Sequence, residues 1–211
     1  MALDTKERIH DAAKYLFAVN GYTDTKVSDI IKRADSNNGS FYHHFGDKGR
    51  LGMEIFREIM KDYDNELTAI CRGTDELVLN ACSVRVFFDA LIKNQSLSRF
   101  VRELFSSRDF HDTENMYTSL YDKYSSKQMN FKTIYLVRRL NEALAGECIL
   151  CLTDDSRIFS AKEISEMYLS VLYPMFNIPK QLIKNVLDEA NSLFNSLEVT
   201  SKEFRVSVTQ K

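Results

Sequence analysis

The stretch GYTDTKVSDIIKRADSNNGSFYHHFGDKGRL, residues 21–51, decides how the N-terminal part of this chain folds. It first carries an apolar stripe at helical period, formed by Val27, Ile30, Ile31 and Ala34. Thr25 stands just before this stripe, where a hydroxyl can cap the free N–H groups of a helix. Residues 35–39 (DSNNG) favour a turn, and Phe41 and Phe45 then lie one helical turn apart. The stretch predicts two short helices joined by a tight polar turn.

A longer helix is expected directly before this stretch. Its apolar stripe consists of Ile9, Ala12, Ala13, Leu16 and Phe17. Asp4 or Thr5 can cap its start, and Asn20-Gly21 ends it where a left-handed residue is easily accommodated. Two short helices across a turn, braced by a first helix, describe a helix-turn-helix. The second short helix of such a unit can enter the major groove of B-DNA, which is about 12 Å wide.

Several short motifs then follow one another in a characteristic order. They are Ala12-Ala13, Leu16-Phe17, Gly21-Tyr22, Thr25, Val27, Asp29-Ile30, Ala34, Gly39-Ser40-Phe41-Tyr42-His43-His44-Phe45 and Lys48. In order and spacing they resemble the N-terminal domain of the TetR family of bacterial transcriptional regulators. The resemblance covers roughly the first quarter of the chain. The rest is similar to the family only in length and helical character.

The resemblance implies DNA contacts at matching positions. It implies phosphate contacts for Thr25, Tyr42 and Lys48. It implies base contacts for Asn37, Asn38, Gly39 and Ser40, and His43 lies one turn further along the same helix. Ser28 matches a position that sometimes reaches DNA. The chemistry agrees, because Asn can pair with adenine through two hydrogen bonds and Lys supplies a point charge for a phosphate. The chain departs from the family at Asp35 and Ser36, where a Gly and an apolar residue are usual. Asp can adopt the left-handed turn, whereas Ser36 removes an apolar plug.

Two pairs of residues, His43 with His44 and Cys148 with Cys151, are of types that can bind metals or undergo redox chemistry. His43 and His44 could suggest a metal, but adjacent helical residues point about 100° apart, so a surface or DNA-facing role is preferred. Cys148 and Cys151 form a C-x-x-C inside an apolar stretch, without a second pair or a nearby His. Buried thiols are the favoured interpretation, and a redox or metal sensor is the alternative. We expect no metal and no cofactor.

Composition and recurrent apolar stripes at helical period point to an all-α chain. The resemblance implies that it has an N-terminal helix-turn-helix domain and a C-terminal helical domain for ligand binding and dimerisation. The 211 residues are 44% hydrophobic and include only two Pro and seven Gly, which argues against a turn-rich β protein. We expect a DNA-binding domain over 1–47, an effector-binding and dimerisation domain over 48–197 and a tail over 198–211. No apolar run approaches the roughly 18 residues that span a bilayer, so we expect a cytoplasmic protein.

Charge alone gives little support for DNA binding. The chain has a net charge of −2, and residues 1–50 carry five Lys and three Arg against six Asp and one Glu. This small excess would neutralise few phosphates. Binding would then need local placement of charge and two copies of the N-terminal domain.

The last two expected helices carry a wide apolar face. Ser160 and Glu163 form a capping box before the first, and Pro179 opens the second. The face consists of Ile164, Met167, Tyr168, Val171, Leu182, Val186, Leu187, Ala190, Leu193 and Phe194. Such a hairpin can pair with its copy in a four-helix bundle, and the resemblance favours this homodimer. The alternative is that both helices close the chain's own core. A two-fold dimer would read a near-palindromic DNA operator.

The middle of the chain is rich in aromatic residues. Those expected to line an effector cavity, as the resemblance implies, are Phe87, Phe88, Phe100, Phe105, Tyr117, Tyr121 and Tyr135, accompanied by Tyr124 and Phe131. Arg85 or Arg138 could anchor a polar group of the effector. Ordinary core packing is the alternative for each aromatic residue.

The sequence therefore predicts a DNA-binding transcriptional regulator, in particular a repressor that releases its operator on binding a small apolar or amphipathic effector. A DNA-binding protein of the same fold whose body docks another protein is the alternative, and it predicts no small-molecule cavity. An enzyme is disfavoured, because no ordered Ser/His/Asp set, Gly-rich phosphate loop or carboxylate–His pattern stands out. The effector, the operator sequence, the regulated genes and the sign of regulation are not encoded in any motif.

Overall fold

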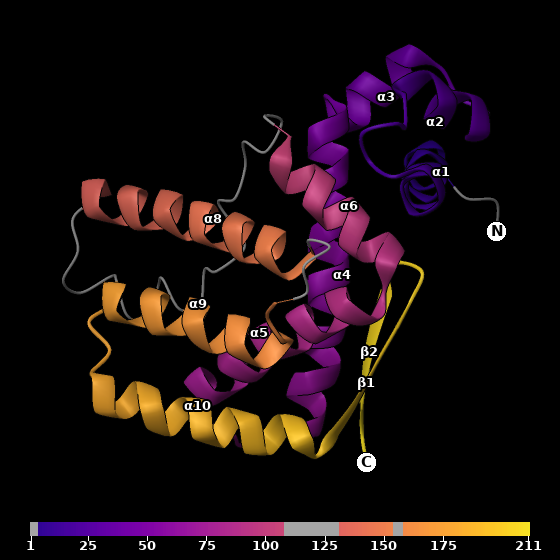
Figure 1. Cartoon of the computed structure of the whole chain (residues 1–211). Coiled ribbons are helices and arrows are strands. Elements are labelled where there is room, and N and C mark those ends of the chain that lie inside the picture. The colour runs from indigo at the N-terminus through magenta and orange to yellow at the C-terminus, as the bar shows by residue number, and fades with distance from the viewer. Residues whose placement is uncertain (1–3, 108–130, 154–157) are drawn as a thin grey trace.

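The computed structural model describes residues 4–107, 131–153 and 158–211 (Figure 1). The helices are α1 (Thr5–Asn20), α2 (Val27–Arg33), α3 (Asn38–Phe45), α4 (Lys48–Ile70), α5 (Glu76–Lys93), α6 (Gln95–Ser106), α8 (Phe131–Thr153), α9 (Ala161–Met175) and α10 (Lys180–Asn195). Two strands follow, β1 (Leu197–Lys202) and β2 (Arg205–Gln210). The described part is mainly helical, as the sequence predicts. None of its helices is long and apolar enough to cross a membrane.

Local capping signals set most helix ends where the sequence analysis places them. Asp4 and Glu7 form a reciprocal capping box at the start of α1, and Gly21 ends that helix with φ +83°. Ser160 and Glu163 form the predicted box at α9. These ends depend on residues within one turn of each other, which is why the sequence alone reveals them.

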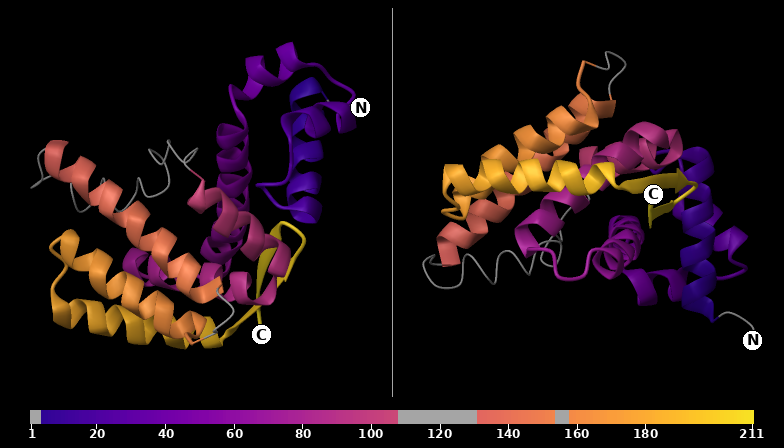
Figure 2. Two further views of the ribbon diagram at one scale, coloured as in Figure 1. Left: turned by 45° about the horizontal axis from the view of Figure 1, so that its top comes forward. Right: turned by 90° about the horizontal axis from the view of Figure 1, so that it is seen from below.

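The chain divides into a small upper part and a larger lower part. We call α1–α3 the N-terminal head and α5, α6, α8, α9 and α10 the body. The long helix α4 begins in contact with the head and runs down to the body (Figure 1). In the body, α9 and α10 lie side by side beneath α8, and α5 packs against all three (Figures 1 and 2).

Three of the aromatic residues expected to line a cavity pack in the core of the described chain. The ring centroids of Phe87 and Phe88 are 5.5 Å apart, and Phe56 packs edge-on against Phe87 at 5.8 Å. Phe100 is fully buried and stacks on Phe17 of α1 at 5.5 Å. Phe87, Phe88 and Phe100 therefore pack in the chain's own core, the alternative given for them, and none of the three lines the clefts described below.

The other expected ligand residues have different outcomes. Phe105 packs against Phe56 at 5.4 Å and also lines a small cleft of about 360 Å³ between α6 and α8. Tyr135 is an exposed residue of α8, so it lines no enclosed cavity within the described part of the chain. Tyr117, Tyr121 and Tyr124 lie outside the described residues.

The apolar face of the last two helices is split between the chain's own core and solvent. Ile164, Tyr168, Val186 and Ala190 are buried within the chain, so their assignment to a dimer interface is wrong and the alternative, closure of the chain's own core, holds for them. Met167, Val171 and Leu182 are 54%, 46% and 42% exposed. Leu187, Leu193 and Phe194 are half-buried, packed against the core from its edge. The apolar face is therefore wide enough to close the chain's own core on one side and to leave apolar side chains exposed on the other.

The end of the chain is a β-hairpin and not a tail. β1 and β2 pair antiparallel, with Val199 opposite Val208, and alternate residues of both strands are buried. β2 packs along α4, where the Glu66 carboxylate accepts a hydrogen bond of 2.7 Å from the Val208 amide. Phe204, in the turn, packs against Phe100 at 4.7 Å. The expected tail is wrong because Leu197, Val199, Val206 and Val208 alternate at the period of a strand.

The cysteines differ in exposure. Cys71, Cys82 and Cys148 are buried and Cys151 is exposed, all as free thiols. Burial raises the pKa of Cys148 to about 11, assisted by the nearby Cys151 and Glu147. A thiol that stays protonated at neutral pH is a poor nucleophile and a poor metal ligand. The prediction of buried thiols is thus confirmed for Cys148 and wrong for Cys151.

Candidate nucleic-acid interface

The third helix presents a polar face to solvent and an apolar face to the head. Phe41 and Phe45 are buried, whereas Tyr42 is 55% exposed and His43 is exposed. Asn37 caps the helix, since its side-chain oxygen accepts a hydrogen bond of 3.0 Å from the Ser40 amide. The segment at the start of α3 is therefore accessible and has a fixed backbone.

The exposed positions of α3 carry side chains suited to DNA. Asn38 and Gly39 are exposed at the first turn, and Ser40 is partly exposed. Asn offers a donor and an acceptor for a base edge, and a Tyr hydroxyl such as that of Tyr42 can donate to a phosphate oxygen. Ser28, on the first turn of α2, is exposed as well. The geometry leaves these side chains free to meet a ligand as large as a DNA duplex.

The turn between α2 and α3 uses the two residues that depart from the family pattern. Asp35 adopts φ +46°, so it takes the left-handed conformation anticipated for it. The Ser36 amide donates to the Ile31 carbonyl at 3.1 Å. The Ser36 hydroxyl oxygen is buried and has no hydrogen-bond partner among the described residues. A polar atom thus occupies the place of the missing apolar plug.

The structure gives Thr25 a different role from the predicted one. Its side chain is only 1% exposed, and its hydroxyl donates to the Gly21 carbonyl at 2.6 Å. The N-cap of α2 is Lys26, which makes no side-chain capping bond. The cap and the phosphate contact predicted for the Thr25 side chain are therefore wrong. Thr25 instead fastens the loop that leads into α2.

Lys48 also holds the head together. Its ammonium donates to the carbonyls of Tyr22 and Thr25 at 3.0 and 3.1 Å, and it lies 4.3 Å from the centre of the Tyr22 ring. These contacts tie the start of α4 to the loop before α2. The predicted phosphate contact by Lys48 is therefore not the arrangement that the structure shows. The sequence carried no signal for this role, because the partners are backbone atoms more than twenty residues away.

Exposed cations that the sequence analysis did not single out lie around α2. Lys26 and Lys32 are exposed, and Arg33 stacks over the ring of Tyr15 with 3.5 Å to its centre. The sequence could have indicated that Lys32 and Arg33 are exposed, because both fall outside the apolar stripe of α2. Asp29 and Asp35 are exposed nearby, so the surface of the head is mixed in charge.

The head is fastened to the body by charged side chains of α6. Arg99 pairs with Asp24 at 3.0 Å and with Glu103 at 2.8 Å. Glu103 also accepts a hydrogen bond of 2.7 Å from the Thr23 amide. Burial disfavours the charged form of Glu103, but the Thr23 amide and the Arg99 guanidinium outweigh burial and lower the pKa of this carboxyl. The loop before α2 is thus directly connected to the body.

A helix-turn-helix with an exposed recognition helix defines the class of DNA-binding helical regulators. Residues 9–53 match the family model described as bacterial regulatory proteins, tetR family. The N-terminal head of this chain is thus of the TetR-family type.

Similar proteins are transcriptional regulators. The chain is 41% identical over 69 residues to the HTH-type transcriptional regulator LmrA of Bacillus subtilis, covering 32% of this chain and 36% of that protein. It is 40% identical over 53 residues to QacR of Staphylococcus aureus, covering 25% of this chain and 28% of that one. The chain thus spans about a third of the length of these two relatives. Their names agree with the prediction that this protein is not an enzyme.

Two comparisons extend over most of the chain. The biofilm operon icaADBC HTH-type negative transcriptional regulator IcaR of Staphylococcus aureus is 27% identical over 205 residues, which is 90% of this chain and 97% of that protein. The crystal structure of a tetR family transcription regulator from Shewanella sp. PV-4 superposes with a TM-score of 0.50 at 15% identity. It covers 82% of this chain and 97% of that chain. The second likeness concerns the fold alone.

Proposed function

We propose that this protein is a transcriptional repressor that binds operator DNA as a homodimer and releases it on binding a small effector. The observation that carries the proposal is the outward polar face of α3, formed by Asn38, Gly39, Tyr42 and His43 over a buried base of Phe41 and Phe45. The likeness to a negative transcriptional regulator over 90% of this chain supports repression. The domain division at residues 47 and 48 belongs to the same proposal.

The DNA contacts that we propose differ in part from those expected from the sequence. Tyr42 contacts a phosphate, and Asn38 meets a base edge, with Asn37, Gly39, Ser40 and His43 around it. Ser28 and the exposed Lys26 approach the backbone from the start of α2. Thr25 and Lys48 position this surface instead of touching DNA.

Dimerisation uses the outer surface of α9 and α10. Met167, Val171 and Leu182 form its exposed apolar part. A shallow groove of about 420 Å³ lies beside them, lined by Ile183, Leu187 and Pro174 together with charged residues. Exposed apolar side chains next to a groove suit a packed helix of a second copy. Two copies would place two α3 helices one DNA turn apart, about 34–36 Å, on a near-palindrome.

An effector-responsive regulator is favoured over one that docks a protein. The alternative predicts no small-molecule cavity, whereas a cleft of about 710 Å³ lies between the head and the body. This volume lies within the range of about 300–1,000 Å³ typical of small-molecule sites. A ligand can act only through different affinities for the two states of the protein, and tenfold release corresponds to about 1.4 kcal/mol.

The test measures binding of the protein to the DNA that flanks its own gene. Fluorescence anisotropy of the labelled DNA gives the affinity at several salt concentrations. Tyr42→Phe should weaken binding to all sequences alike, and Asn38→Ala should change the sequence preference. Tyr135→Phe and Asn65→Ala remove the same groups from exposed positions far from the head and should bind as the unaltered protein does. Unchanged binding by both head variants, or no specific DNA, would overturn the proposal.

A further inference from the structure

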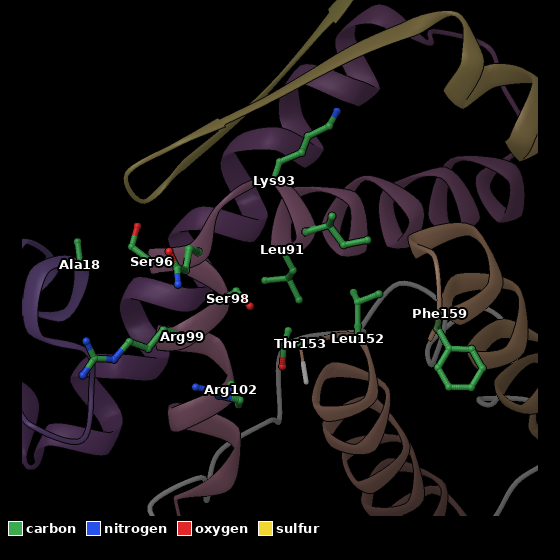
Figure 3. Close-up of a pocket in the computed structure, with 12 residues that line it drawn as sticks. Ala18, Leu91, Lys93, Ser96, Ser98, Arg99, Arg102, Leu152, Thr153 and Phe159 are labelled. Carbon is green, nitrogen blue, oxygen red and sulfur yellow. The ribbon is translucent and has the colours of Figure 1, made fainter. Parts of the chain in front are cut away.

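A cleft lies where the N-terminal head meets the body (Figure 3). Its walls come from α1, from the end of α5 and the start of α6, from the end of α8 and from Phe159 before α9. We call it the junction cleft. It is distinct from the aromatic core in which the sequence analysis expected an effector, because Phe87, Phe88 and Phe100 do not line it.

The junction cleft has a cationic side and an apolar side. Arg99 and Arg102 lie on its cationic side, whereas Lys93 lies beside Leu91 with its amine turned towards the hairpin (Figure 3). None of the described lining residues is acidic. Leu91, Leu152 and Phe159 line the side next to α8 and α9, away from Arg99 and Arg102 (Figure 3). Hydroxyl groups of Ser96, Ser98 and Thr153 complete the wall. This separation of charge and apolar surface is suited to an amphipathic anion.

The cations of the junction cleft differ in what already binds them. Lys93 pairs with Asp89 at 2.7 Å and donates to the Val199 carbonyl at 3.0 Å. Arg99 is held by its two carboxylate partners. Arg102 is exposed and makes no hydrogen bond or ion pair with any described residue. Its guanidinium keeps donors for a planar carboxylate, which it can bind with two hydrogen bonds.

We propose that the junction cleft binds a small amphipathic carboxylate. The carboxylate lies between Arg102 and Arg99, and the apolar chain lies along Leu91, Leu152 and Phe159. The first turn of α6 lines the same cleft, and a helix N-terminus favours negative charge. The site and the class of ligand are inferred from these residues alone. The effect of the bound ligand on DNA binding rests on the proposed function.

Arg99 connects this ligand to the DNA-binding surface. The same guanidinium that faces the cleft pairs with Asp24, in the loop that leads into α2. It also lies tightly against Gly21, where an added Cβ would come within 2.5 Å of Arg99 Nε. A ligand carboxylate on Arg99 competes with Asp24. The loop then loses one of its two polar ties to the body and keeps only the bond from the Thr23 amide to Glu103. With the weaker connection, α2 and α3 shift relative to the second copy.

The first test measures ligand binding without DNA. Isothermal titration calorimetry with decanoate, below its micelle concentration, should show saturable binding by the full-length protein, and uncharged decanol should bind at least tenfold more weakly. Arg102→Gln should lose the decanoate signal, while Arg72→Gln, which removes an exposed cation from the turn after α4, should keep it. Circular dichroism checks that each variant folds. Equal binding of decanol and decanoate, retention by the Arg102 variant, or no decanoate binding would overturn the site.

The second test measures coupling to DNA. Decanoate should lower the operator affinity of the protein about tenfold. Asp24→Asn should abolish this effect and tighten decanoate binding, because coupling between two ligands is reciprocal. Asp62→Asn, an exposed carboxylate of α4, is the matched control. Decanoate binding with unchanged operator affinity would refute the coupling. Absence of operator binding would refute the proposed function and leave the calorimetric test of the cleft intact.

Discussion

Ser36 is the residue at which the turn between α2 and α3 is least well satisfied. Its hydroxyl oxygen is buried without a partner among the described residues, although its amide is bonded to Ile31. A buried polar group without a hydrogen bond costs about 1–3 kcal/mol. We expect Ser36→Ala to raise the free energy of unfolding by about 1 kcal/mol, measured by guanidinium denaturation. A loss of stability would show that the hydroxyl has a partner.

Thr25 is buried beside the proposed DNA-binding surface, and its hydroxyl holds the loop that leads into α2. Thr25→Val keeps the shape of the side chain but removes the bond to the Gly21 carbonyl. We expect a loss of about 1 kcal/mol of stability and no change in the salt dependence of operator binding. Thr25→Ser keeps the hydroxyl and should retain most of that stability. A weaker salt dependence of operator binding in the Val variant would instead support the phosphate contact that the sequence predicts for Thr25.

The cysteines give a test of burial by pH. Burial raises the pKa of Cys82 to about 12, further helped by Cys71, and raises the pKa of Cys148 to about 11. Because the thiolate is the reactive form, a raised pKa keeps both thiols protonated up to about pH 10. Under native conditions at pH 8, iodoacetamide should modify the exposed Cys151 alone, as mass spectrometry can show. Fast modification of Cys148 would contradict its burial.

At the scale of elements, the terminal hairpin joins parts of the chain that are distant in sequence. β2 packs on α4, and Asn94, which caps α6, donates to the Glu203 carbonyl at 2.6 Å. Phe204 packs on Phe100, which in turn stacks on Phe17 of the head. The hairpin therefore supports the contact between head and body that the proposed coupling depends on.

Removal of the Phe204 ring should reveal this support. Phe204 is buried, and truncation of a buried Phe to Ala costs about 3–5 kcal/mol. We expect Phe204→Ala to lower the melting temperature by at least 5 °C, on the order of what such a loss implies for a chain of this size. Lys202→Ala, an exposed position of the same hairpin, is the control and should melt with the unaltered protein. Equal melting of both variants would mean that the hairpin is not part of the folded unit.

At the scale of the whole molecule, the proposed function requires a second copy of the chain. The head carries few net charges, so two heads on one DNA site are needed for tight binding. The face of α9 and α10 is divided so that its inner residues close the core and its outer residues remain exposed. The division leaves a surface for assembly without weakening the single chain.

A charge placed on the outer face should separate the copies. We expect Val171→Glu combined with Leu182→Glu to turn a dimer into a monomer in sedimentation velocity and to reduce operator affinity at least a hundredfold, since a desolvated charge in an interface costs several kcal/mol. Val19→Glu, at an equally exposed position of α1, is the control for oligomeric state. A dimer that survives the double substitution would move the interface elsewhere.

The sequence by itself determined the elements that depend on near neighbours. Apolar stripes and caps such as Asp4 with Glu7 act within one or two helical turns, so their effect can be read from residues close together. The turn at Asp35 and the outward position of Tyr42 belong to the same group.

Only the tertiary structure decided which face of an element meets which partner. The role of Lys48, the packing of Phe87 against Phe56 and the packing of the hairpin on α4 depend on contacts between residues far apart in the chain. The type of a side chain indicates that it needs an apolar or charged partner, but it does not indicate which residue that partner is. That choice is made by close packing of the whole chain, because a buried site accepts only groups that fill its volume and satisfy its polar atoms.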